Sequence, residues 1–158
     1  MTTRRQIRSL AEIRDEVARI DPTAVTVDGP WSIAQVLSHC AQSMEYSLIG
    51  FPLDKPVWFQ ATLGRVVLAK FLRQGYMSHD VQAGIPGAPP PADLEPRAAL
   101  ARLIASIDAF EAHRGTFAPH FAYGHVDKAR YGRVQAMHIA QHLESFRPAS
   151  NGRMKGTA

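Results

Sequence analysis

The sequence predicts an all-α fold, most simply a four-helix bundle with an additional short helix and long connections. Apolar residues recur at three- and four-residue steps in several segments, as on one face of a helix. No segment alternates apolar and polar residues at the two-residue period of a half-buried strand. A chain of 158 residues is typical of one domain, which we expect over residues 1–148, followed by a flexible tail over residues 149–158.

The first half of the chain contains three predicted helices. Helical spacing of apolar residues predicts the first over residues 2–20. Ser32 and Gln35 stand three apart before an apolar run, which is a capping-box pattern and predicts a second helix over residues 32–49. The apolar stretch 57–74 predicts a third helix, and its hydrophobicity predicts deep burial.

The second half begins with a segment that cannot hold regular structure. Residues 76–93 are rich in glycine and proline, which predicts one long surface loop. A fourth helix is predicted to start near Pro96, because proline is tolerated in the first turn, and to end before Gly115. Asp127 is typical of an N-cap and predicts a last helix that runs to about Arg147.

Composition places the chain among globular intracellular proteins. Hydrophobic residues make up 46% and charged residues 20% of the sequence. The single cysteine, Cys40, excludes an intramolecular disulfide and favours the cytoplasm. No run of about 20 apolar residues predicts a membrane span. Without such a span we expect no membrane partner. Basic residues near the two ends, rather than in one basic stripe, carry the net charge of +4, so we expect no nucleic-acid partner either.

The second helix has an unusual polar side. Gln35, His39, Gln42 and Tyr46 gather opposite its apolar residues, and Glu45 is the only formal charge in the segment. An ordinary surface helix would carry several charges on that side. Glutamine, histidine and tyrosine can ligate a metal or hydrogen-bond a ligand, so this side suits the wall of an internal polar cavity.

The last helix carries a histidine pair with metal-ligand spacing. His138 and His142 are four residues apart and therefore share a helix face, together with Tyr131 and Gln135. Imidazole suits zinc, nickel, copper and iron. Two histidines from one helix and a third from another would leave coordination positions open, as in catalytic sites. Spacing alone favours the alternative of two imidazoles on a helix surface.

Two segments resemble the DinB and YfiT-like family of metalloenzymes: WSIAQVLSHCAQSMEYSLIGFP over residues 31–52 and HFAYGHVDKARYGRVQAMHIAQHLESF over residues 120–146. More narrowly, they are similar to a branch known only as a domain of unknown function. The resemblance implies a four-helix bundle with a metal at one end. Its tryptophan-initiated helix and late histidine pair imply the metal ligands His39, His138 and His142. The sequence departs from the branch at Ala122 and Gln141, neither of which is an implied ligand.

The other histidines receive different interpretations. For His120 the sequence leaves three roles open: a fourth metal ligand, a residue that contacts one of the ligands, or a solvated residue in a turn. His79, His113 and His125 are interpreted as ordinary residues, because none shares a helix face with the three implied ligands. Cys40 points toward the apolar side of its helix and is interpreted as a buried small residue rather than a nucleophile.

The resemblance implies a metal-dependent enzyme with a small-molecule substrate. Its reaction would be hydrolysis or a transfer that involves a low-molecular-weight thiol such as bacillithiol or mycothiol. Zinc and nickel are the foremost metals, followed by iron. No carboxylate lies at helical spacing from the three histidines, which favours a substrate thiolate over a general base. No catalytic residue is assigned. The apolar third helix suggests a homodimer. The alternative is a non-catalytic binding or stress-response scaffold without a functional metal site.

Overall fold

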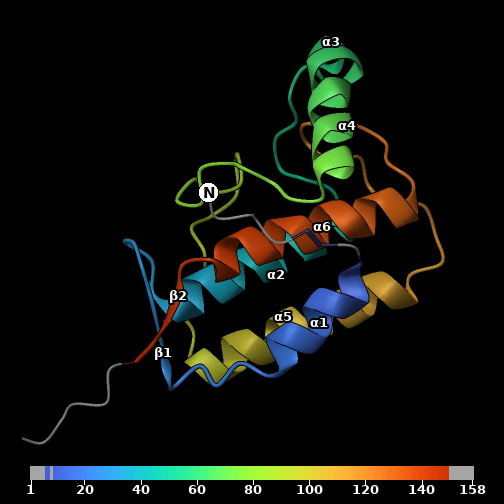
Figure 1. Cartoon of the computed structure of the whole chain (residues 1–158). Helices are drawn as coiled ribbons and strands as arrows, with labels where there is room; N and C mark the ends of the chain where they lie inside the picture. The colour runs from blue at the N-terminus through green and yellow to red at the C-terminus, as the bar shows by residue number, and fades with distance from the viewer. Residues whose placement is uncertain (1–5, 8, 150–158) are drawn as a thin grey trace, which may run out of the picture.

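The structure, a computed structural model, describes residues 6–7 and 9–149 and is mostly helical with a small two-stranded sheet (Figure 1). The helical elements are α1 (Leu10–Ala18), α2 (Ile33–Ile49), α3 (Val57–Phe59), the π-helical turn η1 (Gln60–Gly64), α4 (Arg65–Gln74), α5 (Pro96–Ala112) and α6 (Lys128–Leu143). The strands are β1 (Val25–Val27) and β2 (Phe146–Pro148). No helix among the described residues has the length and apolarity needed to cross a bilayer. The start of the expected first helix and residues 150–158 of the expected tail lie outside the described residues.

Four helices surround the core. Helix α2 packs along α5 and against α6, and α1 packs against both α5 and α6. Each contributes the apolar face that its three- and four-residue spacing predicts. The fully buried side chains include Ile13, Val17, Leu37, Met44, Leu103, Ile107, Met137 and Ile139. Tyr131 lies among them with its ring fully buried.

The ends of the helices follow local side-chain chemistry. Ser32 and Gln35 form the expected capping box, with both reciprocal hydrogen bonds present. Asp127 caps α6 by accepting from the N–H of Arg130. The first helix is shorter than the predicted 2–20. Ser9 is its N-cap and accepts from the N–H of Glu12, so α1 begins at Leu10.

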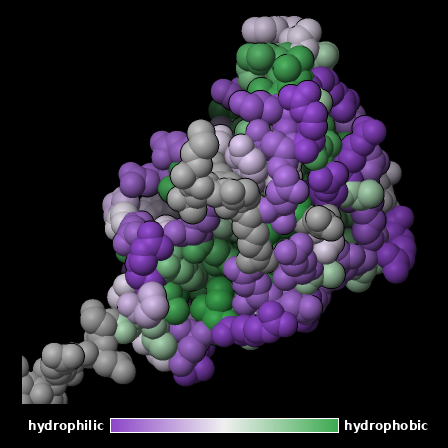
Figure 2. Space-filling model, viewed as in Figure 1, coloured by the Kyte–Doolittle hydropathy of each residue, from purple (hydrophilic) through white to green (hydrophobic). Residues whose placement is uncertain are grey.

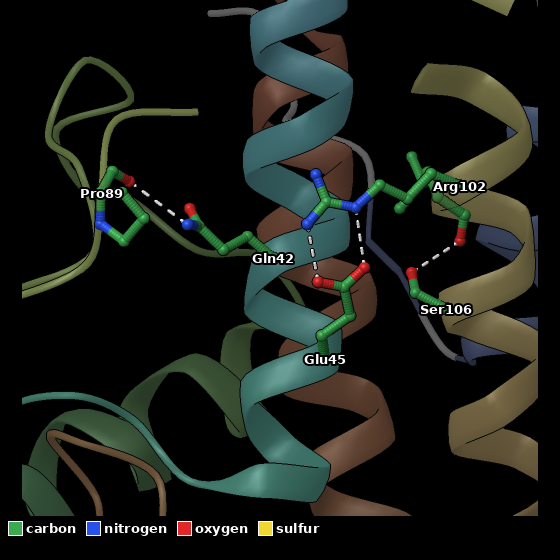
Figure 3. Close-up of polar contacts among 6 residues, drawn as sticks. Gln42, Glu45, Pro89, Arg102 and Ser106 are labelled. Atoms are coloured by element: carbon green, nitrogen blue, oxygen red, sulfur yellow. Dashed lines mark hydrogen bonds and ion pairs between the residues drawn. The ribbon is translucent and has the colours of Figure 1, made fainter. Parts of the chain in front are cut away.

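The single charge of α2 joins it to α5. Arg102 donates to both carboxylate oxygens of Glu45, at 2.8 and 2.7 Å (Figure 3). Gln42, one turn earlier on α2, donates from its amide nitrogen to the carbonyl oxygen of Pro89 at 3.2 Å (Figure 3). These bonds fix α5 and the proline-rich loop on either side of α2.

The two strands correct the all-α prediction. Val25, Thr26 and Val27 pair antiparallel with Pro148, Arg147 and Phe146. The last helix consequently ends at Leu143 rather than near Arg147. Strands of three residues are too short to produce a recognisable two-residue alternation, so the sequence offered no periodic signal. The β1–β2 pairing joins the carboxyl end of α6 to the segment that precedes α2.

The segment α3–η1–α4 corrects the prediction of deep burial. It is helical as expected, but it stands away from the other helices (Figure 1). Val57, Trp58 and Val66 are 80%, 68% and 66% exposed. Figure 2 shows hydrophobic side chains at its outer end. Mean hydropathy does not distinguish a helix buried all round from one anchored only on one side, here by the buried Leu68 and Phe71.

Candidate metal centre

Three histidines from two helices meet at one point. The Nε2 atom of His138 lies 3.2 Å from Nε2 of His39 and 3.2 Å from Nε2 of His142. The candidate ligand atoms of the three side chains all lie within 4.8 Å of one another. Two imidazoles that bind one zinc ion tetrahedrally at 2.0–2.1 Å have nitrogens about 3.3 Å apart. The three side chains are therefore close enough to bind one metal ion.

Helix geometry explains how residues so distant in sequence converge. His138 and His142 are one helical turn apart on α6 and therefore project from the same face. His39 lies on α2, 99 positions before His138, and reaches the pair because α2 packs against α6. The capping box at the start of α2 fixes where that helix begins and hence which of its residues face α6.

Burial keeps the three imidazoles neutral. It lowers the pKa of His39 to about 4 and the pKa of His142 to about 2, because the charged form loses its hydration. The pKa of His138 lies well below its ordinary value through burial and through the neighbouring imidazoles. At neutral pH each ring therefore retains a lone pair for a metal. The Nδ1 atoms of His39 and His138 have no hydrogen-bond partner among the described residues.

The indole of Trp31 covers the cluster. Its ring centroid lies 5.0 Å from that of His39 and 6.4 Å from that of His142. The indole and the His142 ring are nearly parallel, with an angle of 13° between their planes. Trp31 therefore packs against two of the three candidate ligands while it also begins the segment that leads into α2.

His79 is also beside the cluster, although it shares no helix face with the three candidate ligands. Its ring centroid lies 5.0 Å from that of His138 and 5.3 Å from that of His142. His79 belongs to the loop after α4, and helix-face reasoning cannot place a loop residue. By contrast, His113 packs on Phe117 and His125 is exposed, as interpreted.

A cavity of about 270 Å³ adjoins the cluster. His39, His79 and His138 form part of its wall. The apolar part of the wall includes Met77, Ile85, Phe121, Tyr123 and Val134. The polar part includes Ser43, Lys55, Asp80, His120 and Gln135. A largely apolar cavity with a few polar groups is typical of small-molecule sites.

Two of the expected pocket residues line this cavity. The amide of Gln135 accepts from the Ser43 hydroxyl and donates to the Ser43 carbonyl oxygen, both at 3.1 Å. These two bonds fix the Gln135 side chain. His120 forms another part of the wall and lies outside the group of three histidines that are mutually within 4.8 Å.

The remaining expected pocket residues have other positions. Gln35 belongs to the capping box, and Gln42 turns toward the proline-rich loop. Tyr46 packs on Phe51 with a centroid distance of 5.6 Å. Tyr131 is in the core, and its hydroxyl has no hydrogen-bond partner among the described residues. None of these four side chains lines the cavity.

His120 presents one defined nitrogen to ligands. Its Nδ1 atom accepts from the backbone N–H of Ala122 at 3.1 Å. Burial lowers the pKa of His120 to about 3, so the ring is neutral and its proton is on Nε2. The ring stacks on Tyr123 at a centroid distance of 4.3 Å. Nε2 is therefore a hydrogen-bond donor and has no free lone pair with which to bind a metal.

A family model described as a protein of unknown function, DUF1569, matches residues 1–149. The chain belongs to the DUF1569 family. Neither a curated protein nor a solved structure matches it. The family carries no named activity, so the chemistry of this DUF1569 protein has to be inferred from its side chains.

The carboxylates and the cysteine of this DUF1569 protein differ in their relation to the cavity. Glu45 is paired with Arg102, and Glu144 is exposed beyond the end of α6. Asp80 does line the cavity, from the same loop as His79. Sequence reasoning missed Asp80 because only carboxylates at helical spacing from the histidines were considered. Cys40 is fully buried, as interpreted, and burial raises the pKa of its thiol.

Proposed function

We propose that this protein is a metal-dependent enzyme that holds one divalent transition-metal ion on His39, His138 and His142 and acts on a small molecule in the adjoining cavity. The observation that carries this proposal is the pair of 3.2 Å Nε2 separations, which meet at His138, a residue that forms the cavity wall together with His39. The imidazoles are neutral because they are buried, and the residues present therefore fit a metal ion.

The proposal includes membership of the DinB-like superfamily and its four-helix bundle, formed by α1, α2, α5 and α6. Their mutual packing supports this assignment. So does the position of the three histidines, which come from the two helices that the resemblance implies. Zinc or nickel is the proposed metal, with iron as the next candidate, because all three accept imidazole ligands.

The proposed reaction is a transfer that involves a low-molecular-weight thiol, or a hydrolysis. A metal bound here would supply a Lewis acid and lower the pKa of a coordinated thiol or water. In the cavity wall, the Nε2–H group of His120 would be the donor to a bound substrate, and Gln135 is held in place by Ser43. Lys55 brings a positive charge to the cavity wall, which suits an anionic group of the substrate. A thiol substrate would bring its own nucleophile, whereas hydrolysis has a carboxylate available in Asp80.

The test is elemental analysis of the protein purified without a histidine tag, followed by assays of the metal-loaded protein. We expect about one metal per chain. Loaded wild type is then compared with His138→Ala for consumption of a thiol in the presence of an electrophile, and for hydrolysis of an ester and amide panel. No metal binding, even after addition of zinc, nickel and iron salts, would favour the scaffold alternative. Metal binding without any activity over both panels would contradict the proposed reactions.

We also propose a cytoplasmic homodimer that associates with neither nucleic acid nor membrane. The apolar side chains exposed on α3–η1–α4 offer a surface for a second copy. Sedimentation equilibrium of wild type and of Trp58→Ser tests the dimer. A monomeric wild type would contradict it.

A further inference from the structure

The side chain of Gln141 attaches the loop that carries His79 to α6. Gln141, which immediately precedes His142, accepts from the backbone N–H of His79 through its Oε1 atom at 3.1 Å. Its Nε2 atom donates to the backbone carbonyl oxygen of His79 at 2.8 Å. Both backbone polar groups of His79 are thus held by one amide.

The attachment places the His79 ring beside two members of the histidine cluster. Centroid distances within the cluster of His39, His138 and His142 are 5.1, 4.7 and 4.8 Å. The His79 ring lies 5.0 Å from His138 and 5.3 Å from His142. His79 is thus a further imidazole on the cavity side of the cluster, although it lies outside the group of three whose ligand atoms are all within 4.8 Å of one another.

Both ring nitrogens of His79 are buried, and neither has a hydrogen-bond partner among the described residues. Buried polar atoms nearly always have a partner, so a ring with two unsatisfied nitrogens needs an explanation. Coordination would satisfy one of the two nitrogens, because that nitrogen would donate its lone pair to the metal. Packing alone leaves both unsatisfied, and an apolar side chain would fill the same space without that cost.

We propose that His79 is a fourth ligand of the metal centre and that Gln141 is the positioning residue that holds it there. The proposal rests on the proposed three-histidine centre and extends it. Three ligands then come from rigid helices and the fourth from a loop that also forms the cavity wall. A ligand carried by a loop can be exchanged for a substrate donor without moving α2 or α6.

The experiment is a titration of metal-free protein with cobalt(II), followed by visible absorption and by X-ray absorption spectroscopy, which counts bound imidazoles. Wild type is expected to show four imidazoles per cobalt. His79→Ala is expected to show three, with an affinity lower by about 10- to 100-fold, the range found when groups that support a metal site are removed. Gln141→Ala is expected to weaken binding and change the cobalt spectrum although His79 is intact. Gln141→Glu, which retains only the acceptor, should lie between Gln141→Ala and wild type.

Two controls separate these effects from a general disturbance. His113→Ala removes a histidine far from the cluster, and Gln42→Ala removes another glutamine that anchors the loop, through Pro89. Both are expected to match wild type, and circular dichroism checks the fold of every variant. Three imidazoles in wild type, with unchanged affinity in His79→Ala, would overturn the inference and leave the three-histidine centre standing. A wild type that binds no cobalt would instead overturn the proposed function.

Discussion

The indole of Trp31 lies almost parallel to the imidazole of His142, with 13° between the ring planes and 6.4 Å between their centroids. This contact joins the segment before α2 to a candidate ligand near the carboxyl end of α6. A ligand that is held by aromatic packing loses less rotamer freedom when it binds a metal, because its ring is already oriented.

Replacement of Trp31 by alanine should therefore affect both stability and metal affinity. We expect Trp31→Ala to lower the free energy of unfolding by about 1 to 3 kcal/mol. Metal affinity should fall by about 10-fold. Urea unfolding of the metal-free protein measures the first effect, and metal titration the second. Trp31→Phe should retain much of both, and an unchanged affinity in Trp31→Ala would show that the packing does not orient the ligands.

Removal of one ligand from α6 should abolish stoichiometric metal binding. In His138→Ala and in His142→Ala only two helix-borne imidazoles remain, and these form too weak a site, with or without His79 from its loop, to retain a labile ion through purification. Elemental analysis of the untagged variants measures this, with His125→Ala as the control at an exposed histidine. One metal per chain in either ligand variant would contradict the ligand assignment.

Chelation should leave the fold intact. The core of α1, α2, α5 and α6 is apolar and does not include the metal centre, so the metal adds to stability without being its source. At a metal concentration 100-fold above Kd, the melting temperature should exceed that of the chelated protein by about 5 to 10 °C. Far-ultraviolet circular dichroism at 25 °C should remain helical. A loss of helicity in step with metal loss would identify a structural ion.

Acidification should destabilise the metal-free protein. The pKa of His39 is about 4 in the folded chain and about 6.5 when unfolded, so between these values the unfolded state binds more protons. The stabilising difference is present above about pH 6.5 and is lost as the pH falls toward about 4. Urea unfolding at a series of pH values measures the slope. His39→Phe should flatten it, and an equally steep slope in that variant would show that other groups dominate.

Gly64 should not tolerate a side chain. A Cβ atom there would overlap the carbonyl oxygen of Ala122, which belongs to the turn after His120. Alanine is normally favoured over glycine within a helix, but the overlap should reverse the sign and cost about 1 to 3 kcal/mol. Gly84→Ala is the control, because a Cβ atom there meets nothing within 4 Å. Thermal unfolding of the two variants distinguishes them, and equal stabilities would contradict the close approach.

The helices were predictable where local chemistry determines them. The Ser32 and Gln35 capping box predicts the start of α2, and the N-cap residue Asp127 predicts the start of α6. Spacing alone brought His138 and His142 to one face. The choice of His39 as their partner came from the resemblance to a known family, because sequence periodicity does not say which faces of two helices meet.

What the sequence did not reveal depends on contacts between distant segments. His79 and Asp80 reach the cavity because Gln141 holds the loop, a relation across 62 positions that no local pattern encodes. The exposure of Trp58 could not be predicted either, since hydropathy does not say which side of a helix has a neighbour. The β1–β2 pairing is likewise made by backbone groups, which every sequence possesses.

The different surroundings of the two tryptophans give the protein its own optical reporter. Trp58 is largely in water at the outer end of the α3–η1–α4 segment, whereas Trp31 lies on two candidate ligands. In Trp58→Phe the remaining indole emission would come from Trp31 alone. Its intensity and wavelength would then follow coordination at the imidazoles beneath it in real time, without an added dye.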